Sequence, residues 1–198
     1  MKKFLALLLA IVMLSALVSC GGAELTRGVV EGDVYKNESL GLKFNKPSSW
    51  VYSTDDEIAA AIGAAADSVF DGELKDALEK NPTIYDMIVV DTLTRTNINV
   101  GFENLSKTLS SNITVEQYID SLKGQLSKVT EMTVTFHDEI EKVKLGETEF
   151  TKLVCDTAVS GMNMTQVYYL RKVDGYMTFV IVTITSGYTV ADIEAMFN

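Results

Sequence analysis

Three segments of the chain combine helical apolar spacing with the same capping signal at their start. In a capping box, a Ser or Thr and an acid or amide three residues later satisfy the first free backbone amides of a helix. Such pairs occur at Thr54–Glu57, Thr114–Gln117 and Thr189–Asp192. The second pair opens the most amphipathic segment, with apolar residues on one side at positions 115, 118, 119, 122, 126 and 129. We expect a helix after each pair and a fourth over residues 73–79, before Asn81-Pro82.

Apolar runs between these segments predict strands. Residues 40–44 and 50–53 flank a turn that contains Pro47, and residues 84–94 and 98–102 form a predicted hairpin. The second half has the regular turn signals of an antiparallel meander, at residues 146–147, 160–163 and 174–175.

The strand predicted over residues 176–184 decides the fold class. Both of its faces are largely apolar, whereas a strand covered on one face only alternates with polar residues. We therefore expect an α+β fold, a mostly antiparallel sheet flanked by helices on both faces.

The N-terminus resembles the leader of a bacterial lipoprotein. Two lysines precede the uncharged run Phe4–Val18, which is shorter than the ~20 residues of a membrane-spanning helix. Leu17-Val18-Ser19-Cys20 is similar to a lipobox, which implies a diacylglycerol-cysteine, cleavage before it, and further acylation such as palmitate. We expect a signal peptide over residues 1–19, a lipidated Cys20 with a flexible tether over residues 20–33, and a single domain over residues 34–198. The resemblance implies a lipid anchor on the extracytoplasmic face of the cell membrane.

The charge composition limits the kinds of partner that the protein can bind. The chain has 17 basic and 27 acidic residues, and loss of the leader removes two lysines, which changes the net charge from −10 to −12. Binding to nucleic acid needs clustered Lys and Arg, so we expect no nucleic acid partner. An acidic surface favours cationic partners.

The beginning of the predicted domain resembles a known family. Residues 33–50 read DVYKNESLGLKFNKPSSW, with a tyrosine, a polar stretch, Gly-aliphatic-x-Phe, and a proline shortly before a tryptophan. This segment is similar to the opening of PsbP-like domains, the fold of the extrinsic PsbP subunit of photosystem II and of the Ran-binding protein Mog. The resemblance implies an antiparallel sheet flanked by helices and a non-catalytic binding or assembly role. It supplies no active-site residues.

The chain lacks the nucleotide-binding, hydrolase and zinc motifs that can be recognised from spacing. Cys155 lies in an alternating segment and is expected to be a small buried hydrophobe. His137 is the only histidine, followed by Asp138, Glu139 and Glu141. This run fits solvated charges on an edge strand, with a metal site or a hydrolase centre around His137 as alternatives.

Two further acidic groups have structural interpretations. Residues 55–57 begin a predicted helix, where the helix dipole favours acids, and residues 67–72 match only the beginning of a calcium loop.

Aromatic residues gather near the start of the predicted domain and include the single tryptophan, Trp50, and Tyr52. Both fit core packing, and both are interface candidates if they are exposed. From the sequence we expect a membrane-anchored binding or assembly module that uses no cofactor and has a protein partner. An extracytoplasmic hydrolase and a small-ligand carrier are the alternatives.

Overall fold

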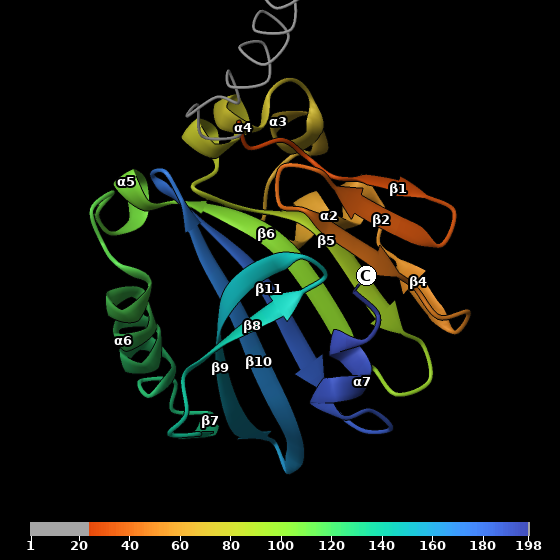
Figure 1. Cartoon of the computed structure of the whole chain (residues 1–198), viewed down its shortest axis with the longest axis vertical. Helices are drawn as coiled ribbons and strands as arrows, with labels where there is room; N and C mark the ends of the chain where they lie inside the picture. The colour runs from red at the N-terminus through yellow and green to blue at the C-terminus, as the bar shows by residue number, and fades with distance from the viewer. Residues whose placement is uncertain (1–23, 198) are drawn as a thin grey trace, which may run out of the picture.

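The structure is a computed structural model that describes residues 24–197. Within them, an eight-stranded antiparallel sheet has the order β4-β5-β6-β11-β10-β9-β7, and β8 also pairs with β9 (Figure 1). Its strands are β4 (Trp50–Tyr52), β5 (Thr83–Asp91), β6 (Asn97–Asn104), β7 (Met132–Phe136), β8 (Glu141–Leu145), β9 (Thr148–Val159), β10 (Met162–Val173) and β11 (Tyr176–Ile184). A smaller sheet contains β1 (Val29–Glu31), β2 (Val34–Asn37) and β3 (Leu42–Asn45). The helices are α2 (Asp55–Ala61), α3 (Ala66–Phe70), α4 (Leu74–Lys80), α5 (Leu105–Thr108), α6 (Val115–Leu126) and α7 (Val190–Glu194).

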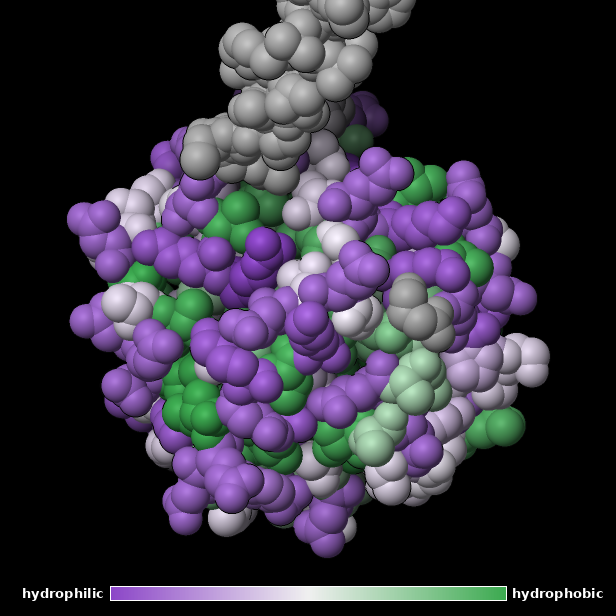
Figure 2. All heavy atoms as spheres, in the orientation of Figure 1, coloured by the Kyte–Doolittle hydropathy of each residue, from purple (hydrophilic) through white to green (hydrophobic). Residues whose placement is uncertain are grey.

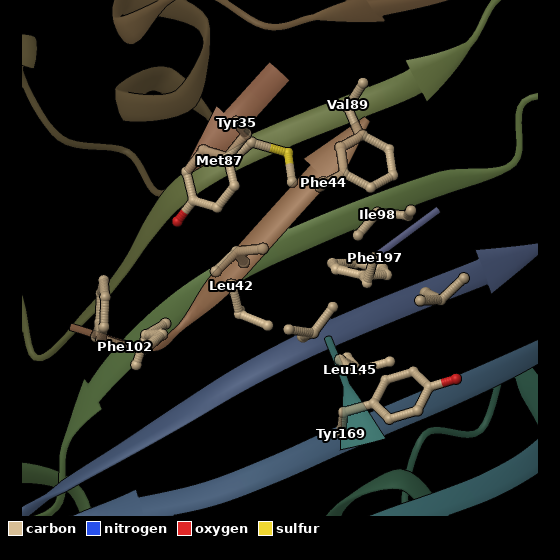
Figure 3. Close-up of a cluster of buried hydrophobic side chains, with 14 of the residues drawn as sticks. Tyr35, Leu42, Phe44, Met87, Val89, Ile98, Phe102, Leu145, Tyr169 and Phe197 are labelled. Atoms are coloured by element: carbon tan, nitrogen blue, oxygen red, sulfur yellow. The ribbon is translucent and has the colours of Figure 1, made fainter. Parts of the chain in front are cut away.

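The main sheet separates two hydrophobic cores, as the apolar faces of residues 176–184 predict. On one face, Val180 and Val182 of β11 join a large cluster with the small sheet, α2–α4 and α7 (Figure 3). On the other face, Met177 and Phe179 pack with α5 and α6. The expected α+β fold with helices on both faces is therefore confirmed. The separate small sheet over the first face was not predicted.

The helix starts follow the capping signals. All three predicted capping boxes form, at Thr54, Thr114 and Thr189. The Ala-rich segment after Thr54 divides into α2 and α3, since Gly63 between them adopts a φ of +69° that ends the first helix.

The edge of the main sheet beyond β9 is interrupted. β7 pairs with the second half of β9 and β8 with its first half, so both strands occupy the same edge. Residues 138–140 between them leave the ladder, and β8 curves over the sheet, where Leu145 is buried near Tyr169 (Figure 3).

The folded unit begins earlier than the predicted domain start at residue 34. The described part of the predicted tether, residues 24–33, contains β1 and packs on the domain. Leu25 is 5% exposed in the large core, and the backbone amide of Thr26 donates to Ser39 Oγ. The expectation of flexibility is therefore corrected for these residues, because tertiary contacts order them. The predicted leader and Cys20 lie outside the described residues. No helix among the described residues has the length and apolar character needed to cross a membrane.

Candidate functional site

A groove of about 540 Å³ opens at the end of the main sheet where β7 begins and β9 turns into β10. We call it the polar groove, because nine of its twelve lining side chains carry a hydroxyl, amide or carboxylate group and none is basic. The lining residues are Thr133, Thr135, Asp156, Thr157, Ala158, Asn163, Met164, Thr165, Ile184, Thr185, Ser186 and Tyr188.

Strand register brings the floor of the polar groove together. Residues paired directly across an antiparallel sheet share a face. Thr135, Asp156, Thr165 and Ile184 are paired in turn across β7, β9, β10 and β11. A second row contains Thr133, Ala158 and Asn163. These rows continue the face that carries the large core, so the groove lies where that face changes from apolar to polar.

Asp156 is the charged centre of this floor. Its Oδ2 lies 2.9 Å from His137 Nε2, and its Oδ1 accepts a 2.8 Å hydrogen bond from Thr165 Oγ1. The hydrogen bond to His137, followed by that from Thr165, lowers the pKa of the Asp156 carboxyl, so the groove keeps a carboxylate at neutral pH.

The same geometry does not assemble a nucleophile. Thr165 donates to Asp156 and not to His137, whereas a hydrolase needs its hydroxyl bonded to the base. The His137 side chain is 49% exposed on the strand edge. The described residues around His137 therefore do not form the arrangement that a hydrolase centre requires.

Trp50 supports the wall of the polar groove from inside. It is 1% exposed, its indole nitrogen donates a 2.9 Å hydrogen bond to the Tyr188 hydroxyl, and the two rings meet edge to face at 5.5 Å. Tyr188 is the groove-lining residue of the pair. Trp50 is thus not an exposed interface residue, and core packing explains it.

Tyr52, the second interface candidate, is half-buried. Its hydroxyl donates to the Asp33 carbonyl at 3.2 Å, and Lys46 Nζ lies 5.9 Å from its ring centre. Burial, and next the charge of Asp33, raise the pKa of Tyr52 to about 12. These contacts connect β4 to the small sheet, which is a structural role.

A β-bulge builds a second polar feature, buried between the two sheets. The pairing of β5 with β6 shifts between Tyr85 and Met87, so Asp86 is the additional residue. The Asp86 side chain is 1% exposed, and its Oδ2 accepts hydrogen bonds from Gly28 N at 2.7 Å, Tyr35 Oη at 2.7 Å and Asn37 Nδ2 at 3.2 Å. Burial outweighs these bonds and raises the pKa of Asp86.

Arg27 completes this buried cluster. Its guanidinium lies 3.7 Å from Asp86, 4.9 Å from the Phe70 ring centre, and donates from Nη2 to the Val69 carbonyl. Burial, partly offset by Asp86, lowers the pKa of Arg27. The cluster attaches the N-terminal segment to β5 and α3. Sequence reasoning missed it, and the one available signal was a polar Asp86 within an apolar strand.

The remaining sequence candidates have structural roles. Cys155 is a free, buried thiol facing α6, and burial raises its pKa to about 11. Asp55, Asp56 and Glu57 form the capped first turn of α2. Across residues 24–197 no three His, Cys, Asp or Glu side chains are grouped closely enough to hold a metal ion, the run from His137 to Glu141 included.

Comparison with known proteins gives structural matches only. No family model and no curated protein matches the chain. Cyanobacterial PsbP (CyanoP) from Synechocystis sp. PCC 6803 is 13% identical, with a TM-score of 0.46 over 86% of this chain and 87% of that one. A Bacteroides thetaiotaomicron VPI-5482 structure is 10% identical, with a TM-score of 0.38 over 86% of this chain and 46% of that one. Both TM-scores are below 0.5, so these likenesses do not establish a family for this chain. Neither likeness bears on function.

Proposed function

We propose that this protein is a lipid-anchored, non-catalytic binding module on the extracytoplasmic face of the membrane, and that the polar groove contacts its protein partner. The observation that carries this proposal is the groove itself, a wide concave surface of hydroxyl and amide groups around one carboxylate. Such a surface can hydrogen-bond to a polar segment, and Asp156 favours a basic residue within it.

Two exposed apolar residues at the rim strengthen this proposal. Met162 begins β10 beside the groove residue Asn163 and is 64% exposed. Leu93 is 81% exposed in the loop whose Thr94 carbonyl accepts a hydrogen bond from the groove residue Thr185. Methionine is enriched at protein interfaces, and an exposed apolar side chain gains free energy when a partner covers it. Otherwise the face in Figure 2 is mainly hydrophilic, with small hydrophobic patches.

The alternative of a small-ligand carrier is less well supported. A carrier of apolar ligands needs an enclosed apolar cavity between sheet and helices. The space between the sheet and its covering layers is instead filled by the side chains of the two cores, and the polar groove is open.

The attachment of the N-terminal segment suggests how the domain is oriented. Glu24 forms a 3.0 Å ion pair with Lys75 of α4, and only three residues separate it from Cys20. Four extended residues span at most about 14 Å. A lipid on Cys20 would therefore hold the α4 end close to the membrane, while β7 and the β9–β10 turn lie at the opposite end of the molecule (Figure 1).

The anchor has a direct test. Replacing the thiol in Cys20→Ala removes the site of lipid transfer, so we expect the protein to leave the membrane fraction or to accumulate as precursor. Fractionation with a metabolically incorporated fatty-acid probe measures both effects. Cys155→Ala is the matched control and should keep the label. Processed, membrane-bound Cys20→Ala protein would contradict the anchor.

The groove is tested separately, by photocrosslinking in cells with a photoreactive residue at Met162. We expect one abundant crosslinked partner, and we expect Thr135→Arg to reduce the yield at least about tenfold, because a long cation fills the groove floor. Thr130→Arg, an exposed threonine outside the lining, is the matched control. Equal yields from the two variants would exclude the groove as the contact surface and leave the anchor unaffected.

A further inference from the structure

The outer edge of β7 is open to a further strand. β7 ends the strand order of the main sheet and pairs with β9 on its other side. In an antiparallel ladder, the backbone groups of successive residues alternate between the two edges of a strand. His137 N donates to the Val154 carbonyl of β9 at 2.9 Å, so the same alternation directs the backbone of Thr135 towards β9. The amides and carbonyls of Val134 and Phe136 therefore point away from the sheet.

These outward groups are left without a protein partner. Across residues 24–197, no backbone or side-chain group bonds the outward amides and carbonyls of Val134 and Phe136. At the start of the strand, Met132 N bonds the Val129 carbonyl at 3.3 Å, and after its end residues 138–140 leave the ladder. The open row thus matches a short extended segment, about as long as the five residues of β7.

The two faces of β7 define which side chains such a segment needs. Residues paired directly across an antiparallel sheet share a face. On one face, a residue opposite Thr135 continues the floor of the polar groove. On the other face, Val134 and Phe136 are only partly buried against the α6 core, and the nearby Val129 is 43% exposed. A fitting segment therefore alternates polar residues on the groove side with aliphatic residues on the α6 side.

The groove side favours a long cationic side chain. Neighbouring strands lie about 4.8 Å apart, so the backbone of a residue opposite Thr135 would lie roughly 10 Å from that of Asp156. Lysine or arginine spans that distance to the carboxylate. Asp156 already bonds His137 and Thr165, and a carboxylate has lone pairs for further donors.

Charges around the strand favour the same kind of segment. Glu131 before β7 and Asp138 and Glu139 after it are exposed. Within residues 24–197 none of these three forms an ion pair closer than 4.0 Å. Lys123 lies over the Phe136 ring, on the opposite face from the groove. A second copy of this chain would bring the same acids to the same edge, so the charges favour a basic partner over self-association.

We propose that β7 accepts a short extended segment of the protein partner as an antiparallel strand, in which basic residues on the groove side alternate with aliphatic residues on the α6 side. Backbone hydrogen bonds to Val134 and Phe136 fix its register, and Asp156 selects its charge. This inference rests on the proposed function, since it describes how the partner of the polar groove binds.

Backbone amide NMR of the full chain in detergent micelles tests the edge directly. The probe is a capped five-residue peptide, lysine-valine-lysine-valine-lysine. We expect it to shift the amides of residues 132–137 with millimolar affinity. The same peptide with glutamate in place of lysine should shift none of them, because the surrounding acids repel it.

N-methylated peptides show whether the contact is a strand pairing. With the valines opposite Val134 and Phe136, the valine amides face β7 and the lysine amides face solvent. Methylation of the valine nitrogens should weaken binding at least about tenfold, because it removes both donors to β7. Methylation of the lysine nitrogens is the matched control and should weaken it less than about threefold.

A proline variant tests the same contact from the protein side. Val134→Pro removes an outward amide and keeps the bonds of Thr135 to β9, so we expect at least about tenfold weaker peptide binding. Val134→Ala keeps the amide and should bind within about threefold of wild type. The methylated peptides use the wild-type chain, so they decide the question if the proline variant does not fold.

Several results would overturn strand addition. They are an absence of shifts at tens of millimolar peptide, equal binding of the two methylated peptides, and equal binding of the lysine and glutamate peptides. Shifts of the same amides on raising the protein concentration without peptide would identify a second copy as the occupant instead. Loss of the Met162 crosslink in Thr135→Arg but not in Val134→Pro would also overturn strand addition, and it would leave the groove as the contact surface.

Discussion

Trp50→Ala is expected to lower the free energy of unfolding by about 3–5 kcal/mol, the usual cost of removing a large buried aromatic side chain. Trp50 is 1% exposed and contacts Phe44 and Tyr188, so its loss leaves a cavity between the small sheet and α7. Urea unfolding followed by circular dichroism measures the effect, because the variant has no tryptophan fluorescence.

Two matched variants separate the effect of burial from the effect of the lost hydrogen bond. Val51→Ala, one residue further and 57% exposed, should change the unfolding free energy by less than about 0.5 kcal/mol. Trp50→Phe keeps an aromatic ring and removes the donor to the Tyr188 hydroxyl. The lost hydrogen bond alone should lower the free energy of unfolding by about 1 kcal/mol. A loss below 1 kcal/mol in Trp50→Ala would contradict the buried position of this residue.

Asp86→Ala should be comparably destabilising, by about 3–5 kcal/mol, because it removes one partner of a buried ion pair. Gly28 N, the Tyr35 hydroxyl and Asn37 Nδ2 lose their common acceptor, and Arg27 loses its counter-charge. We also expect faster hydrogen exchange over residues 24–31, which the cluster attaches to the domain. The exposed change Asp120→Ala within α6 is the control and should alter neither measurement.

The raised pKa of Asp86 gives this position a defined pH dependence. An acid whose pKa is higher in the folded than in the unfolded state favours folding in its protonated form. Its contribution to stability is therefore largest below the ordinary aspartate pKa and decreases as the pH rises through the folded-state value. Asp86→Asn does not titrate, so the stability difference between wild type and this variant should be larger at pH 4 than at pH 7. A difference that is constant or grows with pH would contradict this assignment.

Local signals made most elements predictable. The capping boxes at Thr54, Thr114 and Thr189 involve side chains three residues apart, and the Asp174-Gly175 turn joins neighbouring strands, so neither depends on distant contacts. Both faces of β11 are apolar because both are buried in the fold. This pattern was sufficient to predict covering layers on both sides of the sheet.

The polar groove and the Asp86 cluster depend on strand pairing, which no local sequence pattern encodes. Simple alternation places Ile84 and Met87 on opposite faces, whereas the bulge at Asp86 puts both in the large core, and the bulge is visible only once β5 is aligned with β6. The polar groove requires the register of four strands, with Thr135 and Thr165 thirty positions apart in the chain. Whether Trp50 is buried depends on Tyr188, which lies 138 residues later.

The interrupted edge of the main sheet has a consequence for molecules crowded together. A continuous edge strand offers a row of free backbone groups to a second copy, which is a route to aggregation. Here residues 138–140 break that row, and Glu141, Lys142 and Lys144 place charges on the strand that follows. Proteins held on a membrane as proposed meet their neighbours far more often than in solution. Under those conditions, this edge would keep neighbouring copies from joining their sheets.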